Sequence, residues 1–143
     1  MSALLGLGAG SALCGTTLDT EAWRAYEAVE ESWIRDRHAL IIEQCPECAG
    51  PAAIDLDLKL TELQRRGIQF QYLTKHHPGQ LRGGMWQLSW IPLTARDTVK
   101  MLAASAQYRE YEDRIRRLST TLRNDPHYDH FRNRATTTIP AER

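Results

Sequence analysis

The feature that most constrains the fold is a heptad-spaced apolar series near the carboxyl end of the chain. Its steps alternate between three and four residues for about three heptads, which places every member on one face of a long helix. The series consists of Met101, Ala104, Tyr108, Tyr111, Ile115, Leu118 and Leu122. Thr94 and Asp97 form a capping pattern at its start, and Pro126 follows the expected end near Asn124. The sequence therefore predicts one helix over residues 94–124.

A second helix is predicted over residues 19–44. Apolar residues recur there at steps of three, four and seven, as on one helical face, which we expect to face the core. This stripe consists of Ala22, Tyr26, Val29, Trp33 and Leu40. The residue before a proline avoids helical backbone angles, so Cys45 and Pro46 end this helix.

A shorter helix is predicted over residues 52–66. Pro51 suits its first turn, Gly67 suits its end, and a leucine stripe lies between them. The alternation of apolar and charged residues over 54–60 is also compatible with a half-buried strand. The length and composition of the continuation to Gly67 favour the helix.

Two short stretches with a period of two predict an antiparallel aromatic β-hairpin. Its apolar residues are Ile68, Phe70 and Tyr72 in the first strand, and Trp86, Leu88 and Trp90 in the second. The predicted fold class is therefore α+β, with one domain over residues 19–124. An irregular apolar arm over residues 1–18 and an irregular polar tail over residues 125–143 flank this domain.

Composition excludes several classes of protein. The chain has 143 residues, which fits a single domain, and its 18 basic and 18 acidic residues cancel. A generic polyanion binder is therefore not expected, and no apolar run approaches the roughly 18 residues of a membrane span. The apolar start lacks the basic region of a signal peptide, and three cysteines do not make a secreted disulfide framework. We expect a location in the cytoplasm or within a particle assembled inside the cell.

Cys45 and Cys48 form a C-x2-C pair, which resembles one knuckle of a zinc ribbon. A structural zinc ion needs four ligands, so the pair predicts zinc only if other residues complete the site. The candidates to complete it are Cys14, His76 and His77, or alternatively His127 and His130. A redox dithiol and a turn without chemistry are the other interpretations of the pair.

Residues 52–100 resemble part of a winged-helix regulator. Leu60, Leu63, Gly67 and Ile68 precede a hairpin with a polar tip, and Leu93 and Thr94 then open a helix. The resemblance implies binding to nucleic acid, and the basic residues available are Arg65, Arg66, Lys75 and Arg82. Asp55 and Asp57 depart from the pattern, because carboxylates at the start of the recognition helix would repel phosphates.

The preferred function is a non-enzymatic structural or assembly subunit of a larger complex, of the kind found in virions, secretion machines or accessory subunits. His127 and His130 could contribute a general base, but no nucleophile or phosphate-binding motif accompanies them. The carboxyl half of the heptad series is predicted to contact another chain, in a homo- or hetero-oligomer, with arginines at its rim. These contact residues are Ile115, Leu118, Leu122, Arg114, Arg116, Arg117 and Arg123. A zinc-stabilised nucleic-acid-binding regulator is the alternative.

Charge is distributed unevenly along the chain. Residues 19–49 contain eight acidic and three basic residues, whereas residues 114–134 contain six arginines and two aspartates. We expect the first and last long helices to attract each other, either within one chain or between chains.

Overall fold

The computed structural model describes residues 12–78 and 93–137, and every regular element in these ranges is helical. The elements are α1 (Ala12–Gln44), the 3-10 turn η1 (Pro46–Cys48), α2 (Ala49–His76), α3 (Ala95–Ala104), α4 (Ala106–Arg123) and α5 (Tyr128–Thr137). The predicted α+β fold is therefore wrong for this part of the chain. The second predicted strand, residues 86–90, lies outside the described residues.

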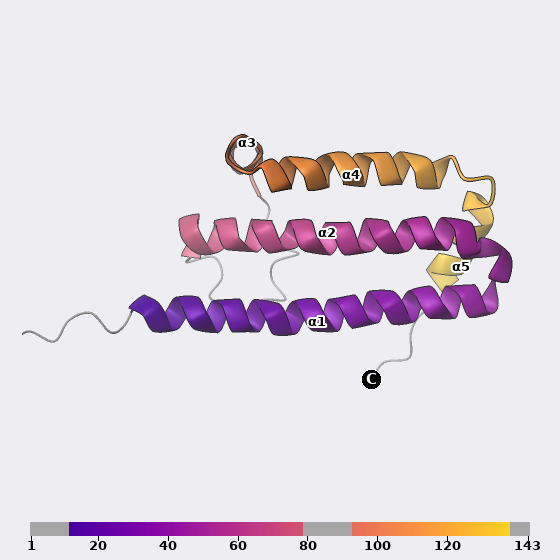
Figure 1. Ribbon diagram of the computed structural model, residues 1–143, viewed down its shortest axis with the longest axis horizontal. Coiled ribbons are helices and arrows are strands. Elements are labelled where there is room, and N and C mark those ends of the chain that lie inside the picture. Colours follow the sequence, from indigo (N-terminus) through magenta and orange to yellow (C-terminus); the bar gives the residue numbers. More distant parts are fainter. Residues whose placement is uncertain (1–11, 79–92, 138–143) are drawn as a thin grey trace, which may run out of the picture.

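Helix α2 is the centre of a flat layer of three helices (Figure 1). Helix α1 packs along one side of α2 and α4 along the opposite side, and consecutive long helices run antiparallel. Helix α3 is seen end-on at the open end of the layer, and α5 lies at the end where α1 bends into α2. The expected attraction between the first and last long helices does not bring them together, because α2 separates them.

The bend between α1 and α2 follows the sequence prediction. Helix α1 ends at Gln44, and Cys45 has non-helical backbone angles, φ −144° and ψ 78°, before the proline of η1. Cys45 and Cys48 are joined by a disulfide across this turn. Two helices joined by so short a turn commonly pack against each other, and here α2 runs back along α1 as an antiparallel pair.

Helix α1 buries a different stripe from the one predicted. Trp23, Ile34 and Ile41 are at most 8% exposed, whereas Val29 and Trp33 are 68% and 48% exposed. The buried residues are separated by eleven and seven positions, so they too recur on one helical face. Because α1 carries two apolar stripes, periodicity alone could not decide which of them faces α2.

Helix α2 continues through the predicted first strand to His76. Phe70 and Leu73 are buried and three residues apart, which is a helical spacing that the alternation over residues 68–72 concealed. Gly67 does not end the helix. It lies beneath Trp23, where a Cβ atom would approach the indole Cζ2 atom to 3.4 Å. The glycine therefore admits the indole ring, which stacks on Phe70 with 5.2 Å between ring centroids.

The single helix predicted over residues 94–124 is divided at Ser105. The Thr94–Asp97 capping box is confirmed at the start of α3. Ser105 then has extended backbone angles, and its hydroxyl accepts a hydrogen bond from the Tyr108 backbone N–H at 3.0 Å to begin α4. Serine is a favoured N-cap because its side chain replaces a missing helical acceptor. Met101 and Ala104 consequently lie on α3, whereas the members of the heptad series from Tyr108 onward lie on α4.

The predicted irregular ends are also partly helical. Helix α1 begins at Ala12, within the predicted arm, and α5 covers residues 128–137 of the predicted tail. Phe131 anchors α5, since it is 3% exposed. The Arg37 guanidinium of α1 donates to the Asp55 carboxylate of α2 at 3.0 Å and to the Ala135 carbonyl of α5 at 3.5 Å. One arginine thus connects three helices.

Buried side chains form two clusters along the layer. The bend cluster contains Ile41, Cys45, Cys48, Ala52, Leu58, Leu122 and Phe131. The open-end cluster contains Trp23, Ile34, Leu63, Phe70 and Leu73. The fold is therefore stabilised at both ends of the α1–α2 pair by separate groups of residues.

We expect Gly67→Ala to raise the free energy of unfolding by up to about 1 kcal/mol, because alanine favours the helix and 3.4 Å is an ordinary carbon–carbon contact. Gly67→Leu should lower it, since the larger side chain must displace Trp23. Urea denaturation of the two variants measures both effects. If both variants were more stable than the wild type, the indole would not lie over this glycine.

Candidate functional site

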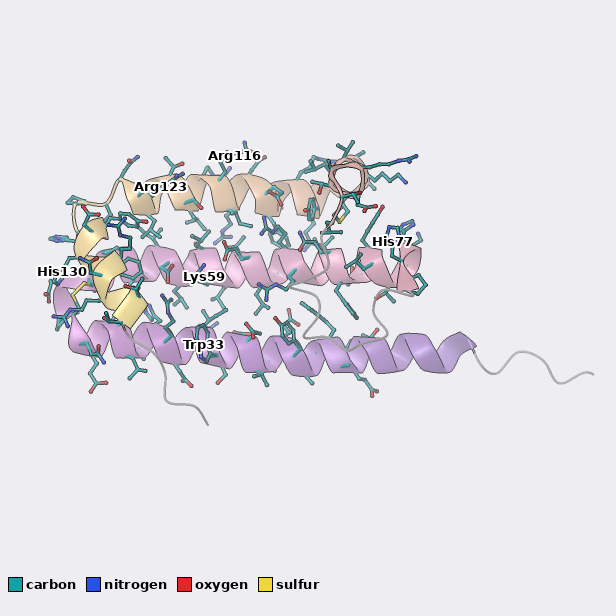
Figure 2. All side chains as sticks on the ribbon, turned by 180° about the vertical axis from the view of Figure 1, so that it is seen from behind. Trp33, Lys59, His77, Arg116, Arg123 and His130 are labelled. Carbon is teal, nitrogen blue, oxygen red and sulfur yellow. A yellow bond between two sulfur atoms is a disulfide. The ribbon has the colours of Figure 1, made fainter. Side chains whose placement is uncertain are left out.

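Cys45, Cys48 and His130 are potential metal ligands that lie together, and we call their site the cysteine corner. Cys45 and Cys48 are both fully buried, and their Cα atoms are 5.3 Å apart. Helix α5 lies across this corner and brings His130 beside the disulfide (Figure 2). One ligand atom from each of the three residues lies within 4.8 Å of the others, the only such group of three among the residues searched in the described ranges. The sequence had offered His130 as one alternative for closing the site.

Glu47 holds the histidine at this corner. His130 Nε2 lies 3.0 Å from Glu47 Oε1, and both side chains are about half exposed. A hydrogen bond from its own backbone, followed by the one from His130, holds the pKa of the Glu47 carboxyl below its ordinary value. Sequence analysis missed Glu47, whose only signal is its position inside the C-x2-C turn.

The other predicted metal ligands do not reach the corner. Cys14 lies in the first turn of α1, and its 31 positions from Cys45 correspond to about 45 Å of helix. His76 and His77 lie at the far end of α2, about 40 Å from Cys48 by the same helical rise. The structure therefore separates these three residues from the C-x2-C pair.

His77 belongs to a different polar cluster, around Asp97. The Asp97 carboxylate accepts hydrogen bonds from the Thr94 hydroxyl at 2.7 Å and the Tyr72 hydroxyl at 2.9 Å, with His77 Nε2 at 3.3 Å. These bonds, that of Thr94 foremost, hold the pKa of Asp97 well below its usual range. Burial and then the bond to Asp97 raise the pKa of Tyr72. The cluster joins the start of α3 to the end of α2.

This cluster predicts a dependence of stability on acid. A lowered native pKa means that the stability from Asp97 is complete above the unfolded aspartate value of about 3.9 and is lost as pH falls below it. We expect Asp97→Asn to be less stable than wild type at pH 7 and to lose less stability on acidification. Denaturant titrations from neutral to low pH measure this difference, and equal slopes in both proteins would contradict it.

The carboxyl half of the heptad series packs inside the chain. Leu122 is 6% exposed and belongs to the bend cluster, and the half-buried Ile115 and Leu118 pack against the same cluster. This face of α4 lies against α2. The series that was predicted to contact another chain therefore supplies much of the intramolecular core.

The four arginines of the predicted rim have different surroundings. Arg114 pairs with Asp57 of α2 at 2.7 Å, and this pairing raises the pKa of its guanidinium. Arg116 pairs with its helical neighbour Asp113 at 3.3 Å, and Arg123 donates to the Ser119 carbonyl at 3.2 Å. Arg117 is exposed, and Figure 2 shows Arg116 on the side of α4 that faces away from α2.

We expect Leu122→Ala to lower the free energy of unfolding by about 2–5 kcal/mol, because it leaves a cavity in the bend cluster. The exposed Arg117→Ala should change it by less than about 0.5 kcal/mol. The double variant Ile115→Asp with Leu118→Asp should unfold. If circular dichroism showed that the double variant stays folded, the intramolecular role of this series would be wrong.

The proposed nucleic-acid residues do not form an unpaired basic face. Arg65 pairs with Glu112 of α4 at 3.0 Å, and Arg66 donates to the Tyr26 hydroxyl at 2.7 Å. Lys75 is exposed near the end of α2, and Arg82 lies outside the described residues. The winged-helix resemblance is wrong over residues 52–78, because the predicted recognition helix and first strand form one continuous helix.

A groove of about 340 Å³ lies between α1 and α2, midway along the layer. Its lining residues are Glu30, Trp33, Ile34, Arg37, Lys59, Glu62, Leu63 and Arg66. Figure 2 places Trp33 on α1 beside Lys59 on α2. Trp33 also belongs to the stripe that sequence analysis assigned to the core. We call this the outer stripe, and it consists of Ala22, Tyr26, Val29, Trp33 and Leu40.

Comparison with protein-family models, curated protein sequences and solved structures finds no significant match to this chain. Among the described helices, none has the length and apolar character required to cross a bilayer.

Proposed function

We propose that this protein is a non-enzymatic assembly subunit whose helix α1 pairs with α1 of a second copy. The observation that supports this function is the exposure of three members of the outer stripe, Ala22, Val29 and Trp33. Tyr26 packs against the open-end cluster, and Leu40 is half-buried. Val29 is 68% exposed and Trp33 is 48% exposed, although other apolar residues of the same helix are buried. An exposed tryptophan beside a groove is characteristic of a contact surface, because aromatic residues are enriched at protein interfaces.

The spacing of the outer stripe suits a helical partner. Its members are separated by four, three, four and seven residues, which is the pattern of a helix–helix seam. The stripe from Ala22 to Leu40 is about 27 Å long. One further seam position lies between Trp33 and Leu40, and the residue there is Asp36, which is not apolar. The seam is therefore short, and its most apolar part centres on Val29 and Trp33.

Charge favours an antiparallel second copy as the occupant. Glu30 and Arg37 lie seven residues apart along one margin of the stripe and have opposite signs. A two-fold axis near Trp33 would place Glu30 close to Arg37 of the partner subunit. This guanidinium also donates to Asp55 of its own chain at 3.0 Å, and it has five N–H donors in all. Glu30 approaches its own Arg66 only at 4.0 Å, and a carboxylate accepts more than one donor. The surface is thus complementary to itself, as a symmetric dimer requires.

An intracellular location is part of this proposal. It is supported by the odd number of cysteines, which does not suit a secreted disulfide framework. Helix α4 does not provide the contact in this arrangement, because its apolar face already packs on α2.

Val29→Asp tests the proposal, with Val99→Asp as a matched control. The two valines are 68% and 65% exposed, and Val99 lies on α3 away from the outer stripe. We expect Val29→Asp to weaken self-association at least tenfold, about 1.4 kcal/mol, because a symmetric interface contains the substitution twice. Sedimentation equilibrium of both variants and of the wild type measures this effect.

The control should associate as the wild type does, and both variants should keep the wild-type melting temperature within a few degrees. A wild-type chain that remains monomeric at high micromolar concentration would overturn pairing between copies. Equal association of the two valine variants would show that the outer stripe is not the contact.

A further inference from the structure

We propose that, once its disulfide is reduced, the cysteine corner binds one Zn²⁺ ion through Cys45 Sγ, Cys48 Sγ and His130 Nδ1. Water would occupy the fourth position. The zinc site does not depend on the proposed pairing of α1, because the corner lies at the bend and the outer stripe lies along α1. Only the source of the reductant rests on the intracellular location proposed above.

The two cysteines have the geometry of a bidentate zinc ligand. Zinc–sulfur bonds of about 2.3 Å in a tetrahedron separate two sulfur atoms by about 3.7 Å. The Cα atoms of Cys45 and Cys48 are 5.3 Å apart on a tight turn, so side-chain rotation can provide this separation after reduction. The ligand atoms of the group, His130 included, already lie within 4.8 Å of one another.

Glu47 determines which nitrogen of His130 would bind the metal. His130 Nε2 is hydrogen-bonded to Glu47 at 3.0 Å, which leaves Nδ1 as the nitrogen for the ion. Metal-bound histidines commonly donate their other N–H to a carboxylate, which fixes the tautomer and the ring orientation. The side chains at this corner therefore supply an orienting carboxylate as well as three ligands.

The sulfur atoms are shielded from solvent in the bend cluster. Both cysteines are 0% exposed and lie among apolar residues, including Ile41 and Phe131. Buried thiols are tolerated in such surroundings as small apolar groups, so zinc binding is inferred from the ligand geometry and not from burial. The disulfide removes the thiols in one state, and coordination to zinc would use them in the other.

The chemistry balances with a dithiol as the reductant. The dithiol transfers two electrons and two protons to the Cys45–Cys48 bond, which opens to two thiols while the dithiol closes to its own disulfide. Zinc then replaces the two thiol protons, which are released to solvent. An intracellular location would supply such reductants, since cytosolic thiols are kept reduced.

Zinc would also link helix α5 to the bend between α1 and α2. Two of the ligands lie at the bend between α1 and α2, and the third lies on α5. The disulfide connects residues within the bend only, whereas the metal would connect the bend to α5. Exchange between these states would therefore alter how firmly α5 is held.

Cobalt titration of the phosphine-reduced full-length chain tests the proposal. We expect one equivalent of Co²⁺ to produce thiolate charge-transfer absorption and the visible bands of a tetrahedral site, and Zn²⁺ to displace it. Cys45→Ser, Cys48→Ser and His130→Ala should each lose these bands. Glu47→Gln should weaken binding about 10- to 100-fold, because it removes the orienting carboxylate.

His127→Ala and Cys14→Ser are the controls and should bind as the wild type does. His127 is an exposed neighbour of His130 on the chain, and Cys14 lies at the opposite end of α1. A reduced wild type that binds no metal would overturn the site, as would His130→Ala binding with unchanged affinity. If a cysteine variant fails to fold, His130→Ala decides, because this side chain is 47% exposed and its removal leaves the bend cluster intact.

Discussion

Helix α2 is covered along two opposite sides, and the arrangement of the other helices depends on this double contact. Two aspartates of α2, separated by one residue, face the two sides. Asp55 pairs with Arg37 of α1 at 3.0 Å, and Asp57 pairs with Arg114 of α4 at 2.7 Å. Positions i and i+2 of a helix point in different directions, so one short segment of α2 forms ion pairs with both α1 and α4. The Asp55 pair is mostly buried, and removing either partner would leave an uncompensated charge.

The bend is the second constraint, because it determines what α5 can contact. Cys45 and Cys48 close the turn, and their burial creates an apolar surface on which Phe131 packs. Arg37 of α1 donates a hydrogen bond to a carbonyl of α5, so the same corner combines apolar, ionic and sulfur contacts. The candidate metal ligands therefore meet where the chain is already most tightly connected, rather than in an open pocket.

Local signals in the sequence predicted helix ends better than helix lengths or faces. The proline after Cys45 and the capping box at Thr94 have physical effects on the backbone within a few residues, and both predictions are confirmed. The hairpin prediction was wrong over residues 68–72, because α2 has neighbours on more than one side. Phe70 stacks on Trp23 of α1 and Tyr72 donates to Asp97 of α3, so an alternating pattern is satisfied within a helix. The proximity of His130 to the cysteines needed tertiary structure, since 82 residues separate it from Cys48.

The two buried clusters share α1 and α2 but no residue. Stability in such a molecule need not be lost in one step, since proteins open locally in units that follow their contacts. The bend cluster is cross-linked and joined by α4 and α5, whereas the open-end cluster is built chiefly from α1 and α2 with Leu93 beside it. At the bend the α1–α2 pair is cross-linked and covered by α4 and α5. Local opening at the opposite end would therefore separate α1 from α2 and widen the groove beside Trp33 while the bend remains intact.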